Sequence, residues 1–410
     1  MKQWFPELLL TITIIIMVVL TLTVKLYSVH LLAPPRTHLA ATGCDQAPTN
    51  PPSARALFLE RYAEDWGVYC ENSPISPYNP PIWQKLYSSY GGGSLECALA
   101  SGSAAYSNVY CYHDMNSKPN AKSFILSFSF WIPATTCNNQ GGESIIQALE
   151  FTFNKYYQSK RYEFALQYQN VWDGYGVNDE PSWHYWIPTA DGISGSWTNL
   201  PNPIHQCLQG NSWHTFLFEG EINSSDQVVY KNFTLDGIAN DLTTIAPQTA
   251  PASTFGEKLT ISVQLDSNSH GDPYKLLLNK INFIAATKRW EVATQADDGT
   301  GGTSGAFSWA IKNAGIDEAI TFQPSVTKIN FTGSLNYHNL QVGALIYGRC
   351  SAKAEITIDG AGTGANSKGL VLNGNNLLYG VKVAKFSLQQ LSIPLASGNN
   401  QLTCVSTSKL

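Results

Sequence analysis

The sequence contains few charged residues for its length. Asp, Glu, Lys and Arg make up 13% of the 410 residues, and the net charge is −5. That share is about half of the roughly 25% typical of globular proteins. Nucleic-acid binding depends on clustered Lys and Arg side chains that neutralise phosphates. Because the sequence has no such cluster, we expect no nucleic-acid partner.

Several chemical motifs are also missing. The sequence shows no phosphate-binding glycine loop and no Ser-His-Asp or Cys-His arrangement. None of its cysteines forms a C-x-x-C pair, which disfavours a zinc ribbon or a thioredoxin-type site. Aromatic residues are plentiful at 12%, with 11 Trp and 20 Tyr. This composition suits a neutral polar ligand such as a sugar, although any β-rich extracellular protein can share it.

One long apolar run is present, at the N-terminus. Leu8 to Val24 is a stretch of 17 residues without a charge. It is longer than the core of a signal peptide, about 7–15 residues, and just long enough for a spanning helix. We expect an uncleaved, single-pass signal anchor within residues 1–32, with a cleaved signal as the alternative. The charges that flank the run do not fix its orientation.

The eight cysteines indicate disulfides. An even number of cysteines, spread through β-rich sequence beyond an apolar run, is typical of an oxidising compartment. The C-terminal bulk of the chain would then be extracellular. Candidate pairs are Cys97–Cys111 across a hairpin, Cys137–Cys207 within one sandwich, and Cys350–Cys404 in the last domain. Connectivity cannot be deduced from sequence, and buried free thiols are the alternative.

The remaining chain reads as all-β. Residues 33–60 are rich in Pro, Ala and Thr and predict a linker. Many short alternating runs separated by turn signals then predict a two-sheet sandwich over 61–290. Near residue 295 the pattern changes to brief apolar runs separated by Gly and Asn, at about 20 residues per pair of runs. This spacing predicts stacked coils of a short parallel β-helix over 291–410.

Two stretches carry a resemblance to known families. GGSLECALASG at 92–102, SFILSFSFWIP at 123–133, PSWHYWIP at 181–188 and CLQGNSWHTFLFEGEI at 207–222 are among the matching residues. On these grounds residues 90–290 resemble the concanavalin A-like lectin/glucanase sandwich, in a version found in bacterial surface proteins of unassigned activity. The resemblance implies a jelly roll with one concave sheet. In lectin and glucanase members the concave side meets the glycan.

The second stretch is ADDGTGGTSGAFSWAI at 296–311. It keeps the glycine pattern and the Ala310-Ile311 pair of a D-x-G-x-G opening, but has Phe-Ser where Leu-Arg is usual. Residues 295–395 thus resemble the start of a right-handed, pectin-lyase-like parallel β-helix. Polysaccharide lyases and adhesins share that fold, and no lyase-type site is visible here. Asn373, Asn375 and Asn376 are expected at a coil corner.

The stretch 147–170 predicts a binding surface. Strand alternation places Glu150 on one face of its strand and Gln167 and Gln169 on one face of the next. If the apolar faces pack inward, pairing brings Glu150 near these amides on an outer face. Amides and a carboxylate can hydrogen-bond vicinal hydroxyls of a sugar. A merely solvated face is the alternative.

Aromatic residues of PSWHYWIP would add rings to this face. The register decides whether Trp183 and Tyr185, or His184 and Trp186, contribute them. Packing of the tryptophans in the core is the alternative. The predicted ligand-binding residues are Glu150, Gln167, Gln169, Trp183 and His184. For Glu150, an ion pair with Arg161 or Lys160 is a competing role.

Catalysis is the less favoured possibility. Glycoside hydrolysis needs two carboxylates, about 5–5.5 or 6.5–9.5 Å apart, and glucanases of this fold place them on one strand. Here that strand keeps only Glu150, so Glu219, Glu221 or Asp173 would have to supply the second. A calcium site formed by the oxygens of Asp266, Asn268 and Asp272 is a weaker hypothesis, since solvation also explains that loop.

The sequence therefore favours a membrane-anchored extracellular protein that binds polysaccharide or mediates surface adhesion without catalysis. A glycoside hydrolase or polysaccharide lyase is the first alternative. A purely structural surface protein is the second.

Overall fold

The computed structural model describes residues 66–71, 85–88, 92–99, 107–134, 136, 144–170, 181–190, 195–204, 207–323, 325–333, 338–348, 355–394 and 400–408. They belong to two compact units. One unit extends to Lys118 and resumes over Ile125–Phe283, and the other comprises Pro119–Phe124 and Ile284–Leu410. The predicted anchor and linker, residues 1–60, lie outside the described residues. Within the described ranges, no helix has the length and apolar character needed to cross a membrane.

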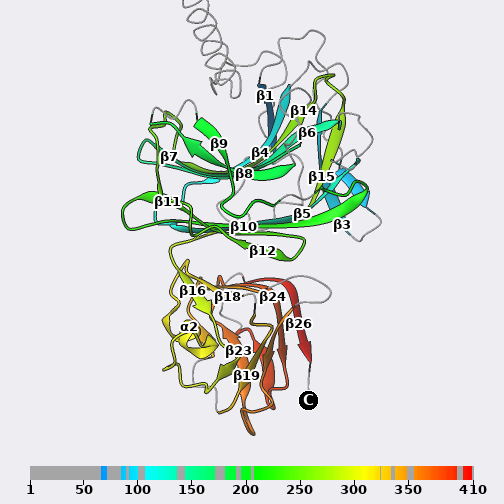
Figure 1. The fold of residues 1–410 in the computed structure, drawn as a ribbon. Helices are drawn as coiled ribbons and strands as arrows, with labels where there is room; N and C mark the ends of the chain where they lie inside the picture. Colours follow the sequence, from blue (N-terminus) through cyan, green and yellow to red (C-terminus); the bar gives the residue numbers. More distant parts are fainter. Residues whose placement is uncertain are drawn as a thin grey trace, which may run out of the picture. The chain divides into compact units, whose positions relative to one another are not determined.

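The first unit is a sandwich of two β-sheets that form two layers in Figure 1. Sheet 1 has the strand order β1-β4-β14-β6-β7-β8-β9. Sheet 2 has the order β12-β11-β10-β5-β15-β3-β2, with β13 beside β11. Every pair in this unit with a described register is antiparallel. The predicted two-sheet sandwich is confirmed at this level.

The strands of sheet 1 are β1 (Gly67–Glu71), β4 (Asn108–Asn116), β14 (Lys258–Ser267), β6 (Ile146–Tyr157), β7 (Lys160–Gln169), β8 (Ser182–Pro188) and β9 (Gly195–Asn199). The strands of sheet 2 are β12 (Ile238–Asp241), β11 (Gln227–Leu235), β10 (Ser212–Ile222), β5 (Ser123–Ile132), β15 (Tyr274–Ala286), β3 (Gly92–Leu99), β2 (Lys85–Ser88) and β13 (Gln248–Thr249).

Aromatic rings fill the space between the two sheets. Phe151 of β6 lies 4.8 Å from Phe216 of β10, measured between ring centroids. Phe153 lies 5.1 Å from Phe218 in the same way. These separations suit tilted ring pairs, which stabilise a core beyond their buried area. Because strand side chains alternate, burying Phe151 and Phe153 sends the residues between and beside them to the outer face of sheet 1.

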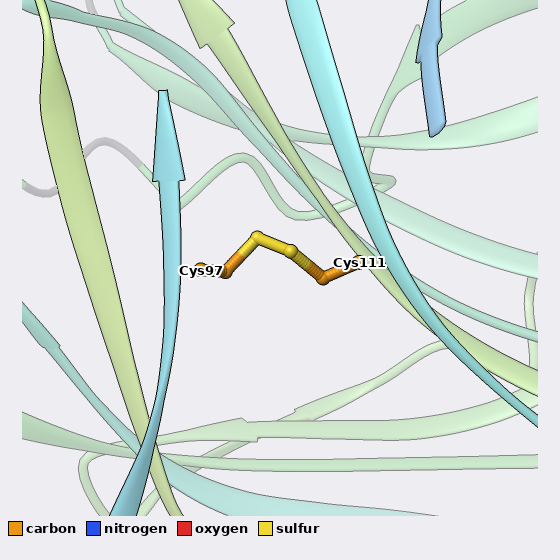
Figure 2. The surroundings of a disulfide bond; sticks show 2 residues. All are labelled: Cys97 and Cys111. Carbon is orange, nitrogen blue, oxygen red and sulfur yellow. A yellow bond between two sulfur atoms is a disulfide. The ribbon is translucent and has the colours of Figure 1, made fainter. Parts of the chain in front are cut away.

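A disulfide joins Cys97 to Cys111, as predicted, with the two Cα atoms 6.2 Å apart. Figure 2 shows the bond running between two separate strands. The expectation that it spans a hairpin is wrong. Cys97 lies on β3 of sheet 2 and Cys111 on β4 of sheet 1. Both side chains are buried, so the bond crosses the core and ties the two layers together.

Each of the other two predicted disulfides includes one cysteine that lies outside the described residues. Cys207 is disulfide-bonded, but Cys137 lies outside the described residues. The neighbours of this pair do meet, since the Thr136 backbone N–H donates to the Leu208 carbonyl oxygen at 3.0 Å. Cys137–Cys207 therefore stays a prediction with a favourable setting. Cys350 lies outside the described residues too, so Cys350–Cys404 stays a prediction.

Removing the described disulfide should lower the free energy of unfolding. The two cysteines are 14 residues apart, and a loop of that size is expected to contribute about 3 kcal/mol through the unfolded chain. We expect a loss of about that size for the double variant Cys97→Ala/Cys111→Ala, measured by urea unfolding. Each single variant, Cys97→Ala or Cys111→Ala, should lose the same free energy of unfolding as the double variant. Unchanged stability would contradict the role given to this bond.

At one end of the core, His214 of β10 is held between two acceptors. Its Nδ1 lies 2.7 Å from Asp236 Oδ2, and its Nε2 lies 2.9 Å from the Gln209 carbonyl oxygen. Burial alone would lower the pKa of His214, but the hydrogen bonds to Asp236 and Gln209 outweigh it and raise the pKa. Burial would raise the pKa of Asp236, and the bonds from His214 and Thr215 lower it instead.

This pair predicts a window of maximum stability. The raised pKa of His214 means that its contribution is complete below the ordinary histidine value of about 6.5 and is lost as pH rises through the folded pKa. The lowered pKa of Asp236 means that its contribution is complete above about 3.9 and is lost as pH falls through the folded pKa. Urea unfolding between about pH 4 and 9 should show the alkaline loss in the wild type. In His214→Gln that loss should be absent, and an identical pH profile would refute the assignment.

The second unit is built from parallel strands. Sheet 3 has the order β16-β18-β21-β24-β22-β19-β17, with β26 beside β24, and sheet 4 has the order β20-β23-β25. The elements are β16 (Arg289–Val292), β17 (Ala296–Asp297), α2 (Phe307–Asn313), β18 (Ala319–Phe322), β19 (Lys328–Phe331), β20 (Asn339–Leu340), β21 (Leu345–Tyr347), β22 (Ile356–Asp359), β23 (Lys368–Leu372), β24 (Leu377–Ala384), β25 (Gln389–Ser392) and β26 (Gln401–Ser408).

Strands of successive chain segments stack in register in this unit. Ile320 pairs with Ile346, and Ile346 pairs with Leu378, always in parallel. All three side chains are fully buried and belong to one apolar core. Such pairing between neighbouring coils is what the brief, evenly spaced apolar runs predict. The assignment to a right-handed parallel β-helix goes further and stays a prediction.

The departure from the expected D-x-G-x-G opening has a local reason. Asp297 is buried and accepts hydrogen bonds from the Ser308 backbone N–H at 2.6 Å and from Ser308 Oγ at 2.5 Å. Its Oδ1 also accepts from the Gly299 N–H at 2.8 Å. Ser308 occupies the position of the usual Arg and fixes the turn before α2. At the predicted coil corner, Asn376 donates to the carbonyl oxygens of Gln341 and Ala344.

Candidate functional site

A row of polar side chains crosses the outer face of sheet 1. Register places Gln264 beside Glu150, Glu150 beside Gln167, Gln167 beside His184, and His184 beside Asn199. We call these five residues the polar row. Each comes from a different strand, in the order β14, β6, β7, β8, β9. At about 4.8 Å between neighbouring strands, the row is about 19 Å long, the length of a short oligosaccharide.

The polar row faces outward because packing between the sheets fixes which residues of β6 face inward. Leu149 and Phe151, the neighbours of Glu150, are both fully buried between the sheets. A slip of one residue in pairing would exchange the two faces of β6 and put the carboxyl group in the core. The predicted meeting of Glu150 with Gln167 is confirmed, because the two residues are directly opposite each other.

Side chains of the row form a hydrogen-bonded layer. Gln264 Nε2 donates to Asp266 Oδ1 at 2.5 Å, and Gln167 Nε2 donates to Asp266 Oδ2 at 3.4 Å. Gln169 Nε2 donates to Gln167 Oε1 at 2.5 Å. Beside them, Thr152 Oγ1 donates to Glu150 Oε1 at 2.8 Å. The amide groups therefore converge on Asp266.

A second row of side chains lies beside the polar row on this face, two residues further along each strand, and it has aromatic rings at both ends. There Tyr112 of β4 and Trp186 of β8 stand at either side of the small residues Ser262, Thr152 and Ala165. A Cβ added to Gly195 would lie 2.3 Å from the Trp186 ring, so the ring lies directly over this glycine of β9. Trp197 follows, with its ring centroid 5.0 Å from that of Trp186.

Most of the polar row is closed to solvent in this structure. Glu150 is 2% exposed, and Gln167 and Gln264 are each 5% exposed. His184 and Asp266 are partly exposed, and Asn199 is exposed. Gln264 Oε1 is buried and has no hydrogen-bond donor within the described part of the chain. Asn154 Oδ1, on the same face of β6, is in the same state.

Trp183 does not belong to this face, which corrects the prediction for that residue. Its side chain is fully buried between the sheets, 4.7 Å from the Phe233 ring and 6.0 Å from the Phe151 ring by centroid. The register Tyr168↔Trp183 and Gln167↔His184 decides the alternation. Of the two ring pairs that the sequence allowed, His184 with Trp186 is therefore the outer one.

The carboxylates proposed as a second catalytic acid are not brought to Glu150. Glu219 lies on β10 of sheet 2, between the core residues Phe218 and Gly220, and so faces outward from that sheet. Glu150 faces outward from sheet 1, so the sandwich separates the two. Glu221 pairs with Lys231 at 3.3 Å on the same sheet as Glu219. Asp173 lies outside the described residues.

Arg161 and Lys160, the cations considered as ion-pair partners of Glu150, pair with other carboxylates. Arg161 pairs with Glu163, and both side chains are buried. Lys160 Nζ pairs with Asp226 Oδ2 at 2.5 Å. These cations are thus held by carboxylates near their own end of β7.

The loop considered for calcium uses its oxygens internally. Asn268 Oδ1 accepts hydrogen bonds from the backbone N–H groups of His270 and Asp272, each at 3.1 Å. Both Asp266 oxygens accept amide donors. No group of three His, Cys, Asp or Glu side chains suited to a metal ion occurs among the described residues. Calcium stays a hypothesis without added support.

Sequence reasoning missed the partners supplied by β14 and β9. The alternation of KLTISVQLDS shows that Gln264 and Asp266 share a face, but no local signal shows that β14 inserts between β4 and β6. Trp197 and Asn199 come from the short edge strand GSWTN, which the sequence analysis did not treat as a strand.

No family model and no curated protein matches the sequence. Solved structures that are similar to this chain include an endo-β-1,4-glucuronan lyase from the fungus Trichoderma reesei. Its sequence identity is 10% and its TM-score is 0.31, and the match covers 49% of this chain and 84% of that one. The Emp47p carbohydrate recognition domain has 13% identity and TM-score 0.31, with 53% and 95% covered. Basic winged bean lectin with Tn-antigen has 10% identity and TM-score 0.30, with 53% and 97% covered.

The contact between Gly195 and Trp186 gives a direct test of the site's construction. In Gly195→Ala, the added Cβ would clash with the Trp186 ring at 2.3 Å and with the Ile187 carbonyl oxygen at 2.5 Å. Overpacking of this kind costs about 1–3 kcal/mol. We expect that loss in urea unfolding, together with altered tryptophan fluorescence. The control Gly256→Ala meets nothing within 4 Å and should leave both unchanged. Equal behaviour of the two variants would contradict the packing.

Proposed function

We propose that the sandwich binds a glycan on the outer face of sheet 1, along the polar row. The observation that carries the proposal is the buried, unpartnered oxygen of Gln264, directly beside Glu150. An unsatisfied buried acceptor costs about 1–3 kcal/mol. Such a group calls for a partner, and we propose that a bound ligand supplies it. A sugar hydroxyl is a donor of the right size.

The surroundings of the row support a sugar over other polar ligands. Tyr112, Trp186 and Trp197 provide rings close to amides and a carboxyl group. A pyranose has an apolar face that packs on rings and an equatorial belt of hydroxyls that hydrogen-bonds amides. The length of about 19 Å across five strands fits several sugar units better than one. The carboxyl, amide and aromatic groups lie on one face of the sheet, as recognition of an oligosaccharide requires.

The wider architecture completes the proposal. Residues 8–24 would act as a single-pass signal anchor at the cell membrane, and residues 33–60 as a linker to an extracellular, lectin-like sandwich of concanavalin A type. The buried Cys97–Cys111 bond supports an oxidising compartment. The in-register parallel strands after residue 289 would be the start of a short right-handed β-helix. Recognition of polysaccharide or surface adhesion without catalysis is the proposed role.

Hydrolysis is the second candidate, and one observation favours it. Asp266 and Glu150 lie on adjacent strands at diagonal positions of the same face, since Asp266 is opposite Ala148. The backbone positions of diagonal residues on paired strands are about 7–8 Å apart, and the carboxyl groups of inverting glycosidases are about 6.5–9.5 Å apart. The carboxyl groups of Glu150 and Asp266 would then be general acid and general base.

A glycan array with the full-length protein tests the binding proposal, and a reducing-end assay on the bound glycans separates binding from hydrolysis. We expect binding without new reducing ends. Glu150→Gln should weaken the binding at least tenfold, because a charge-assisted hydrogen bond to a sugar hydroxyl is lost. Glu219→Gln, on the outer face of the other sheet, is the matched control and should bind like the wild type.

Three other outcomes are informative. Reducing ends that disappear in both Glu150→Gln and Asp266→Asn would favour the hydrolase. Unsaturated sugar ends would favour a lyase. An empty array would refute glycan binding and leave a structural surface protein.

A further inference from the structure

We infer that the polar row selects glycans that donate hydrogen bonds, so that its ligand is a neutral, hydroxyl-bearing glycan and not a polyuronate or a sulfated sugar. This inference rests on the proposed function and narrows the class of ligand. It follows from the open oxygen of Gln264, which the bond to Asp266 orients, and from the carboxyl groups of Glu150 and Asp266 on the same face.

One N–H of each glutamine amide in the layer is already used. Gln264 Nε2 and Gln167 Nε2 both donate to the carboxylate of Asp266. Gln169 Nε2 donates to Gln167 Oε1. Thr152 Oγ1 donates to Glu150 Oε1. These contacts hold one N–H of each amide and the Thr152 hydroxyl within the layer.

Two amide oxygens on this face are open acceptors. Gln264 Oε1 and Asn154 Oδ1 are buried and accept no hydrogen bond from the described part of the chain. The orientation of the Gln264 amide is fixed by chemistry, because a carboxylate accepts only and the NH₂ group must face Asp266. The oxygen is therefore forced to the other side. A ligand that pairs these two oxygens has to bring donors.

Hydroxyl groups and acidic groups differ on this point. A sugar hydroxyl donates one hydrogen bond and can meet the oxygen of Gln264 or Asn154. An ionised carboxylate or sulfate only accepts, so it would leave these oxygens unpaired and add repulsion from Glu150 and Asp266 on the same face. Replacing the C6 hydroxyl of each sugar by a carboxylate should therefore weaken binding strongly.

The basic side chains on this face lie away from the row's centre and are engaged. Lys258 Nζ donates to Asp114 Oδ2 at 2.7 Å, and Arg161 pairs with Glu163. Lys258 and Arg161 are opposite or near Tyr156, three pleats along β6 from Glu150. Recognition of a uronate usually relies on a bidentate Arg or a Lys at the carboxylate. At the row itself the described positions are Gln, Glu, Gln, His and Asn.

Matched oligosaccharides that differ only at C6 test the inference. The probes are β-1,4-linked glucose and glucuronate tetrasaccharides, β-1,4-linked mannose and mannuronate tetrasaccharides, and any array hit beside its C6-carboxylated derivative. Binding to the full-length protein is measured by calorimetry. We expect the neutral member to bind at least tenfold more tightly. Gln264→Met, which removes the open oxygen, should weaken neutral binding at least tenfold, whereas the control Gln227→Met should not.

Each alternative result has a separate meaning. Equal or tighter binding of the acidic member would overturn the inference while glycan binding stands. Wild-type affinity in a folded Gln264→Met would also overturn it, because the open oxygen would then have no role. If Gln264→Met does not fold, as judged by its melting curve, the affinity ratio of each matched pair in the wild type decides. No binding of any glycan would refute the proposed function itself.

Discussion

The packing of aromatic rings between the two sheets is the constraint on which the sandwich depends. Phe151 and Phe153 meet Phe216 and Phe218 across the core. Where Phe164 needs room, Gly220 provides it, since a Cβ at that glycine would lie 2.3 Å from the Phe164 ring. These contacts fix which residues of β6 and β7 face inward. The outer face of sheet 1 is thus determined by packing on its hidden side.

Much of this arrangement could be predicted from strand alternation. The period of two residues assigns Glu150 and Gln167 to one face, and their pairing follows once β6 and β7 form a hairpin with the turn at Gln158 and Ser159. Trp183 shows where local pattern fails. In SWHYWIP both faces carry rings, so alternation alone cannot tell which ring is buried. Only the register with β7, set by Tyr168 opposite Trp183, decides.

Long-range contacts were the part that sequence could not supply. Cys97 and Cys111 are close in sequence, and a hairpin is the simplest geometry for that spacing, yet their strands belong to different layers. Asp266 looked like a loop ligand because Asn268 and Asp272 follow it. Its actual contacts, with Gln264 and Gln167, require β14 to lie beside β6. Strand neighbours that are distant in sequence leave no local periodicity to detect.

The place of β14 in sheet 1 has a consequence for how the protein is made. This strand, Lys258–Ser267, lies between β4 and β6, both of which precede it by about a hundred residues or more. During synthesis the two earlier strands leave the ribosome without the neighbour that joins them, and their edges stay open for the time that translation needs to reach Ser267. Sheets that are completed by such late strands fold slowly, and their unpaired strand edges are prone to aggregation until then. A chaperone that shields the edges of β4 and β6 would meet this protein at that stage.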